Sequence, residues 1–236
     1  MLENFKLVLN AVNAGDRTAI RLECAKCKLK FCYKEITDKS TLSDFCPMRV
    51  ADEIIRKTAA RYRGKSARKI YIAAAQTEKE AYKWVDGKLA PTRPRVRELV
   101  EFAKKLGVKK IGISFCIGLS DEASRIVEIL EHHGFTTYSV VCKCGAIDKT
   151  EFGVPAVFKI RDPSEFEAGC NPILQAKLLN LAETEINVIV GLCVGHDMLF
   201  TMESKAPVTT LVVKDRLTGH NPAASLYTSY HRRLIT

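Results

Sequence analysis

Four cysteines in the first fifth of this 236-residue chain have the spacing of metal ligands. Two cysteines separated by two residues can place both sulfurs on one metal, and two more complete a set of four thiolates. Such a set binds either a tetrahedral Zn²⁺ ion or a four-iron cluster. The last cysteine precedes a proline, as in bacterial ferredoxin motifs, although the rest of that spacing is absent. We expect a [4Fe–4S] cluster, with Zn²⁺ or free thiols as alternatives, at Cys24, Cys27, Cys32 and Cys46.

The other five cysteines are spread over the later part of the chain, and most of them follow predicted strands. Ligands of open parallel α/β sheets bind beyond the carboxyl ends of the strands, so residues that follow parallel strands meet there. Another cysteine directly precedes an Asn-Pro helix start, where the helix N-terminus stabilises a thiolate. We expect a second, cofactor-binding sulfur site, formed by Cys116, Cys142, Cys170 and Cys193.

Two kinds of chemistry suit this second group. Three or more converging sulfurs could hold a second iron–sulfur cluster or another metal with an open coordination position. Alternatively, Cys193 is a catalytic nucleophile with His196 as its base and Asp197 beside it. Lys214 and His220 are further candidates for acid–base or substrate-orienting roles.

Each of these residues also has a purely structural interpretation. Free cysteine is among the residue types most often buried in a core. Asp197 would serve as a helix N-cap, and His220 would order the cap that Asn221 gives to the last helix. The tripeptide Lys214-Asp215-Arg216 would be a surface ion-pair turn.

Four predicted strands, rich in β-branched residues, alternate with helices in the later part of the chain. Prolines at first helical positions and asparagine caps mark several helix starts. This alternation predicts an α/β fold of the Rossmann-like three-layer type, with a mostly parallel sheet covered on both faces. The predicted strands are 108–115, 135–141, 186–190 and 208–213; the predicted helices are 47–62, 67–84, 94–106, 121–133, one that begins at 171–172, and 223–233.

The pattern divides the chain into three parts. Residues 1–22 form a helical extension, with an amphipathic helix over 1–14. Residues 23–47 form a four-cysteine metal-binding segment, in which ligation replaces the missing core. Residues 48–236 form the α/β domain, with a helical lead-in over 48–92 and the sheet core over 93–236.

The composition is that of a soluble protein, with 47% hydrophobic and 27% charged residues. No apolar stretch is long enough for a membrane helix, and the N-terminus lacks the features of a secretion signal. We therefore expect a cytoplasmic protein without a membrane partner. In that reducing compartment structural disulfides are rare, and nine cysteines cannot all pair.

The net charge of +10 is concentrated partly in residues 56–69. Such a basic stretch could bind nucleic acid or an acidic partner. No aromatic-rich RNA motif or DNA-reading fold accompanies it, so a solvated helix face is favoured.

Five motifs form a distinctive set along the chain. They are the N-terminal four cysteines, Gly112–Leu119, Cys170-Asn171-Pro172, Gly191–Asp197, and Lys214–Arg216 with Gly219–Pro222. Over residues 22–233 the set resembles a prokaryotic family of unknown function, described as predicted metal-binding proteins. The resemblance implies metal binding, chiefly at 24–46, and no known reaction. The first 20 or so residues extend beyond the family's usual start. Cys144 stands where the family more often has an apolar residue, which favours Cys142.

These observations predict a metal-binding protein, with iron–sulfur favoured, that carries a second cysteine-rich site at the sheet edge. That site would serve redox or sulfur chemistry on a small molecule, or exchange with an electron-transfer partner. The alternative is a zinc-stabilised binding or regulatory module for nucleic acid or an acidic partner, without catalysis. The sequence leaves open whether the protein is an enzyme.

Overall fold

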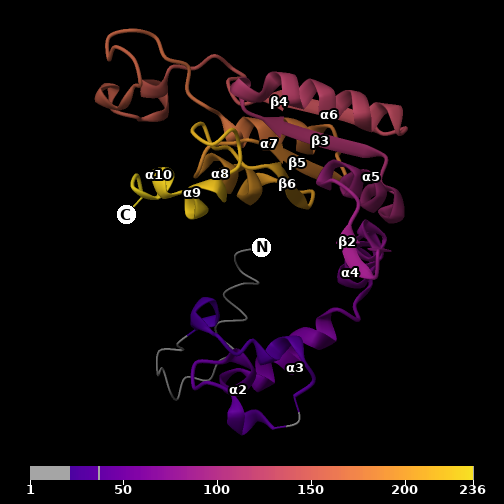
Figure 1. The fold of residues 1–236 in the computed structure, drawn as a ribbon. Coiled ribbons are helices and arrows are strands. Elements are labelled where there is room, and N and C mark those ends of the chain that lie inside the picture. The colour runs from indigo at the N-terminus through magenta and orange to yellow at the C-terminus, as the bar shows by residue number, and fades with distance from the viewer. Residues whose placement is uncertain (1–21, 37, 236) are drawn as a thin grey trace. The chain divides into compact units, whose positions relative to one another are not determined.

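The computed structural model describes residues 22–36 and 38–235, and the chain forms two compact units, Met1–Tyr71 and Ile72–Thr236 (Figure 1). The helix expected over residues 1–14 lies outside the described residues. None of the helices in the described part is long and apolar enough to cross a membrane.

The first unit is built from short elements with almost no hydrophobic core. Leu42 is the one buried hydrophobic side chain among its described residues. The helix expected over 47–62 is interrupted at Ala51, whose φ of −132° and ψ of 32° are not helical. The elements are the 3₁₀ turns η1 (Cys24–Lys26), η2 (Phe31–Tyr33) and η3 (Lys39–Thr41), and the helices α2 (Pro47–Val50) and α3 (Asp52–Arg61).

Helix α4 (Lys65–Ala81) crosses the boundary between the units, and a β-hairpin follows it. The helix expected to reach residue 84 ends earlier, because residues 82–85 pair as β1 (Tyr82–Val85) with the antiparallel β2 (Lys88–Pro91). The two turn residues, Asp86 and Gly87, both have positive φ, which is the conformation that matches the twist of a tight hairpin.

Four parallel strands form the central sheet of the second unit, as the mixed α/β prediction requires. Their order is β4-β3-β5-β6, so the chain first builds outward from β3 to β4 and then crosses to β5 on the other side. The strands are β3 (Lys110–Phe115), β4 (Thr136–Val141), β5 (Ile186–Val190) and β6 (Val208–Val212).

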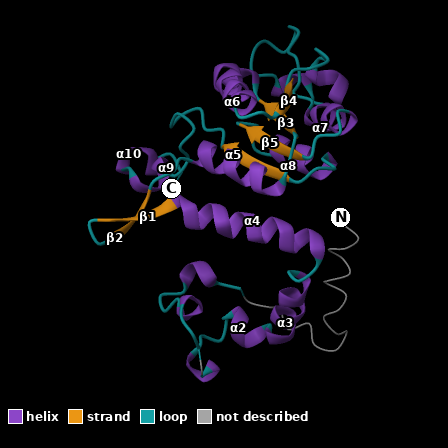
Figure 2. Cartoon of the chain, turned by 90° about the vertical axis from the view of Figure 1, so that its right-hand side faces the viewer, coloured by secondary structure: helices purple, strands orange, loops and turns teal. Residues whose placement is uncertain are grey.

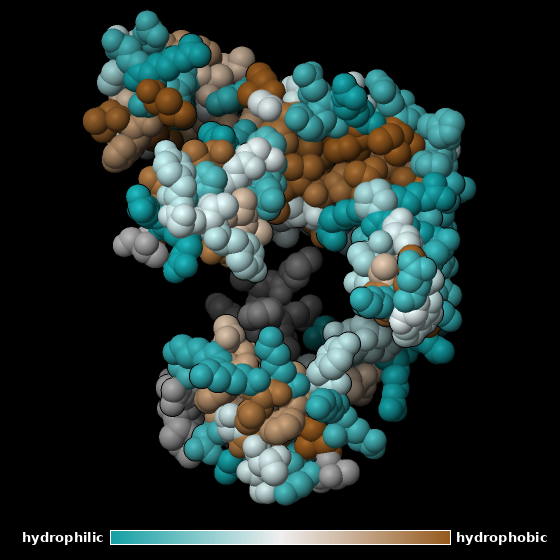
Figure 3. Space-filling view, viewed as in Figure 1, coloured by the Kyte–Doolittle hydropathy of each residue, from teal (hydrophilic) through white to brown (hydrophobic). Residues whose placement is uncertain are grey.

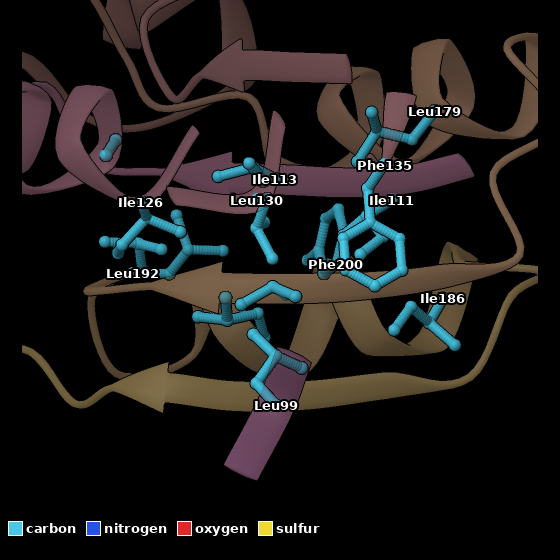
Figure 4. Packing of buried hydrophobic residues seen from close by; sticks show 14 of the residues in the cluster. Leu99, Ile111, Ile113, Ile126, Leu130, Phe135, Leu179, Ile186, Leu192 and Phe200 are labelled. Atoms are coloured by element: carbon cyan, nitrogen blue, oxygen red, sulfur yellow. The ribbon is translucent and has the colours of Figure 1, made fainter. Parts of the chain in front are cut away.

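Helices cover both faces of this sheet (Figure 2). α5 (Arg95–Leu106) and α6 (Ser120–His132) lie on one face, and α7 (Pro172–Leu181) and α8 (His196–Glu203) on the other. Apolar side chains of the strands and helices interlock in one buried cluster (Figure 4), whose largest members include Ile111, Ile113, Leu130, Val188 and Phe200.

Outside the sheet, the C-terminal segment differs from the prediction, and the long connection between β4 and α7 was not predicted. The final helix expected over 223–233 is two short helices, α9 (Ala224–Tyr227) and α10 (Ser229–Arg232), because Thr228 between them is extended. Asn221 caps neither helix with its side chain. Residues 144–169, called the wall segment below, connect β4 to α7 and contain the 3₁₀ turns η5 (Lys149–Phe152) and η6 (Ala156–Phe158).

Candidate functional site

The carboxyl ends of all four parallel strands meet at one edge of the sheet. Cys116 follows β3 and Cys142 follows β4, each at the first position after its strand. Cys193 follows β5, and Lys214 follows β6. The strand order reverses between β3 and β5, which is where ligands bind in sheets of this kind.

A cavity of about 740 Å³ opens at this edge, a size typical of small-molecule sites. We call it the sulfur cleft, because three cysteines line it. Basic residues, apolar residues of the wall segment and the first residues of α7 line the remainder. The lining includes Cys116, Gly118, Lys143, Lys149, Phe152, Val154, Ile160, Cys170, Asn171, Cys193, His196, Lys214 and Arg216.

Cys142 is buried behind the cleft and hydrogen-bonds to both Cys116 and Cys170. These hydrogen bonds, together with burial, raise the pKa of Cys142. Cys142 therefore keeps its proton, and its Sγ also accepts a hydrogen bond from the Ile117 backbone N–H at 3.4 Å. The three thiols form a contact chain with a protonated centre.

The two outer thiols are thiolate candidates. Hydrogen bonding to Cys142, and then to Lys214, lowers the pKa of Cys116. Hydrogen bonding to Cys142, and then to His196, lowers the pKa of Cys170. Because Cys142 has only one S–H proton, it can donate to one of these neighbours at a time. The other thiolate must then be stabilised by its own basic partner.

Each cysteine that lines the cleft has at least one basic side chain beside it. Lys214 Nζ lies 2.6 Å from Cys116 Sγ, and an Arg216 guanidinium nitrogen lies 3.0 Å from Cys193 Sγ. The ammonium beside Cys116 favours its thiolate, which is the nucleophilic form of cysteine. The edge therefore combines nucleophilic sulfur with positive charge.

The remaining predicted site residues have side-chain partners other than those of the predicted Cys193–His196–Asp197 arrangement. His196 hydrogen-bonds to Cys170. Asp197 Oδ1 accepts hydrogen bonds from the backbone N–H groups of Gly195 and Met198, so it organises the start of α8. His220 Nδ1 accepts from the Asp215 N–H at 3.2 Å and orders its own loop. Neither Asp197, His220 nor Cys144 is among the residues that line the cleft.

Arg216, Lys143 and Lys149 line the cleft, although they were not assigned to a site from the sequence. Arg216 belongs to the Lys214–Arg216 motif and lies two residues after Lys214, and side chains two positions apart in extended chain point the same way. The two lysines belong to or adjoin the wall segment, for which the sequence showed no clear pattern.

The wall segment forms one side of the cleft and is held by ion pairs. Asp148 Oδ2 pairs with Lys159 at 3.0 Å, and Glu167 pairs with Lys149. Several large hydrophobic side chains of this segment are exposed, and they lie among hydrophilic residues at the upper left of Figure 3. They are Phe152, Val157, Phe158, Ile160 and Phe166.

The N-terminal four cysteines line a separate, smaller cavity of about 170 Å³ in the first unit. None of the four forms a disulfide bond. Apolar side chains, including Phe31, Leu42 and Phe45, line the rest of it. Within residues 22–36 and 38–235, no three His, Cys, Asp or Glu side chains are arranged closely enough to hold a metal ion. Ligation would therefore require the four thiolates to draw together around the metal.

Comparisons with known proteins identify a family and a relative whose descriptions name no activity. A family model described as "Protein of unknown function (DUF1847)" matches residues 46–211. That range contains Cys116, Cys142, Cys170 and Cys193 but ends before Lys214. "Uncharacterized protein MJ0455" of Methanocaldococcus jannaschii is 41% identical over 214 residues, which are 91% of this chain and 98% of the relative. The resemblance to a family of unknown function is therefore confirmed, whereas metal binding stays a prediction. The chain belongs to the DUF1847 family.

Proposed function

We propose that the sulfur cleft carries out thiol-based redox or sulfur chemistry on a small molecule. The contact chain Cys116–Cys142–Cys170 is the observation that carries this proposal. Thiols that pack only as core residues need no cationic neighbours, whereas here the outer two have Lys214 and His196 as partners. A cavity of about 740 Å³ gives a small molecule room beside them.

A reaction with an organic disulfide illustrates the chemistry. The Cys116 or Cys170 thiolate attacks one substrate sulfur, forms a mixed disulfide, and expels the other half as a thiolate. Cys142 then attacks the protein sulfur of the mixed disulfide, forms a Cys142 disulfide, and releases the second half; its proton passes to a departing thiolate. Two protein thiols have been oxidised and one disulfide reduced. A dithiol reductant restores the starting state.

The scaffold that we propose for this site is a Rossmann-like three-layer fold. The parallel strand order and helices on both faces support that description. In such folds the crevice at the switch point, here between β3 and β5, takes the ligand. The cleft lies beyond the carboxyl ends of these two strands.

We propose a metal centre at Cys24, Cys27, Cys32 and Cys46. The four thiols share one apolar-lined cavity, and the surrounding unit has almost no core of its own. These features suit a site at which the metal stabilises the fold. A [4Fe–4S] cluster is favoured over Zn²⁺ because the set contains only one Cys-x2-Cys pair, whereas zinc ribbons usually have two, and because its last cysteine precedes a proline as in bacterial ferredoxin motifs. A second cluster in the sulfur cleft stays a prediction.

The alternative function is a zinc-stabilised module that binds nucleic acid or an acidic partner. It is supported by the exposed basic residues of α3 and α4, which include Arg61, Lys65 and Arg68. Binding that depends on salt and weakens when Arg61 and Arg63 are neutralised would favour it. The cytoplasm remains the expected compartment for either function.

Thiol mapping tests the main proposal. Reduced protein, purified without oxygen, is treated with one equivalent of a small disulfide, and the new disulfide is located by peptide mass spectrometry. We expect a disulfide between Cys142 and either Cys116 or Cys170. Cys142→Ser should stop the reaction at the mixed disulfide, whereas Cys144→Ser, a matched control outside the cleft lining, should react as the natural protein does. No reaction at Cys116 or Cys170 would overturn the proposal.

A further inference from the structure

The sulfur cleft is lined by basic side chains without an acidic one among the described residues. The basic set is Lys143, Lys149, His196, Lys214 and Arg216. A cavity whose charges have one sign concentrates ions of the opposite sign. The lining therefore favours an anion over a neutral or cationic molecule.

Two of these basic residues remain available to a ligand. Lys149 is paired with Glu167, and Lys143 Nζ donates to the backbone carbonyl of Ala168, so both hold the wall segment. Lys214 and Arg216 form no ion pair with a carboxylate in the described part of the chain. Their recorded partners in the cleft are the sulfurs of Cys116 and Cys193.

The loop after β6 explains why Lys214 and Arg216 reach the cleft while the acidic residue between them does not line it. Asp215 Oδ1 accepts hydrogen bonds from the backbone N–H groups of Leu217 and Thr218, at 2.9 and 3.0 Å. The Asp215 carboxylate is thus hydrogen-bonded to backbone N–H groups of its own turn. The neighbours on either side, two positions apart, both line the cleft.

The surroundings of these two cations add positive potential and an apolar surface. The first residues of α7 line the cleft, and a helix N-terminus carries a partial positive charge. Phe152, Val154 and Ile160 line the wall side. At about 740 Å³ the cleft is far larger than one inorganic ion, so it has room for an organic body as well.

We propose that the sulfur cleft binds a small organic anion, with its oxyanion group between Lys214 and Arg216 and its apolar body against Phe152, Val154 and Ile160. The anion would be the substrate of the proposed thiol chemistry, and for that role this inference rests on the proposed function. Binding itself requires no reaction, so it can be measured separately.

Calorimetric titration of the full, reduced protein with unreactive probes tests the inference. Benzenesulfonate, phenylphosphonate and benzoate share one ring and differ in the oxyanion group, and benzenesulfonamide is their neutral counterpart. We expect at least one anion to bind at least about tenfold more tightly than the sulfonamide, a difference of about 1.4 kcal/mol. The preferred anion distinguishes a tetrahedral group from a carboxylate.

The double variant Lys214→Met/Arg216→Met should lose this preference. Lys177→Met is the matched control, because Lys177 lies on α7 outside the cleft lining and pairs with Glu203 at 2.6 Å. Circular dichroism of both variants checks the fold. Equal affinity for the anions and the sulfonamide, or a preference that survives in the double variant, would overturn the inference. Anion binding without thiol reactivity would overturn only the proposed function.

Discussion

Lys214 Nζ lies 2.6 Å from Cys116 Sγ, although the two residues are 98 positions apart in the chain. The contact joins the loop after β6 to the residue after β3, and β5 separates those two strands in the sheet. A hydrogen bond between an ammonium and a thiolate is stronger than one between neutral partners. It therefore links the reactivity of Cys116 to one side chain that can be replaced.

Replacing Lys214 with methionine should make Cys116 less reactive at neutral pH. Lys214 contributes to the lowered pKa of Cys116, so its removal should raise that pKa toward the ordinary value of about 8.5. The thiolate fraction between pH 6 and 8 then falls. Residue-resolved alkylation with iodoacetamide across this pH range measures the change. Lys177→Met serves as the control, and an unaltered pH profile in Lys214→Met would show that Lys214 does not stabilise the thiolate.

Cys170→Ala should have the opposite effect on Cys116. The variant leaves the Cys142 proton with one acceptor and removes a neighbouring negative charge, and both changes lower the pKa of Cys116. Alkylation of Cys116 should therefore persist to lower pH than in the natural protein. Cys142→Ala, which removes the shared donor, should raise the pKa of Cys116 instead. If both variants shift the profile in the same direction, the shared-proton arrangement is wrong.

The strands of the α/β unit were predictable because their apolar, β-branched runs are bounded by clear breaks. The strand predicted over 186–190 has those limits in the structure, and the one predicted over 208–213 ends one residue earlier. The hairpin over 82–91 was not predicted because β1 begins directly after the last residue of α4, and because both strands are short and largely exposed, so no buried alternating pattern marks them. An Asp-Gly pair such as Asp86-Gly87 is typical of hairpin turns, but local sequence did not show that the flanking residues pair.

The convergence of cysteines at one edge could be predicted from parallel strand topology alone. Their partners could not, because pairing across the edge depends on loop conformation. His196 was expected beside Cys193, yet it contacts Cys170, and Arg216 contacts Cys193. The central, buried position of Cys142 likewise follows from packing of the segment that leads to Cys170, for which the sequence offered no pattern.

Gly112→Ala should destabilise the α/β unit. A Cβ at this position in β3 would lie 2.0 Å from Asn187 Oδ1 and 2.9 Å from Leu179 Cδ1. Asn187 is fully buried and held by Thr184 and Ser204, so it cannot move freely. Overpacking of this kind typically costs about 1–3 kcal/mol. Urea unfolding measures the loss, and Gly118→Ala, whose Cβ would meet only Lys214 Nζ at 3.5 Å, is the control.

Asp148→Asn should loosen the wall segment. Asp148 accepts hydrogen bonds from the Thr150 and Glu167 N–H groups, at 2.9 and 2.7 Å, and pairs with Lys159, so it ties together both ends of the segment. Trypsin cleavage after Lys159 and Arg161 should become faster at pH 7. Asp162→Asn is the control, because Asp162 bonds only locally to Ser164. Equal cleavage rates in the two variants would contradict this role.

Acid should loosen the same segment in the natural protein. Hydrogen bonding to Thr150 lowers the pKa of Asp148, and hydrogen bonding to Lys149 lowers the pKa of Glu167 to about 2. A carboxylate with a lowered folded-state pKa stabilises above its ordinary pKa of about 4, and this contribution is lost as pH falls through the folded-state value. Cleavage by an acid-active protease should therefore increase between pH 4 and 2, and increase less in Asp148→Asn.

Loss of the four-cysteine ligands should remove the metal and unfold the first unit without unfolding the second. Leu42 is the one buried hydrophobic side chain in the described part of that unit, so little apart from ligation would hold it, whereas the α/β unit has its own continuous core. Cys24→Ser/Cys27→Ser, purified without oxygen, should lose nearly all iron, zinc and acid-labile sulfide. Proteolysis should increase within residues 23–61, and the main thermal transition should persist. Cys144→Ser should retain the metal.

Equal metal content in the double variant and the natural protein would exclude these cysteines as ligands. A colourless natural protein with one zinc and no sulfide would exclude the iron–sulfur cluster.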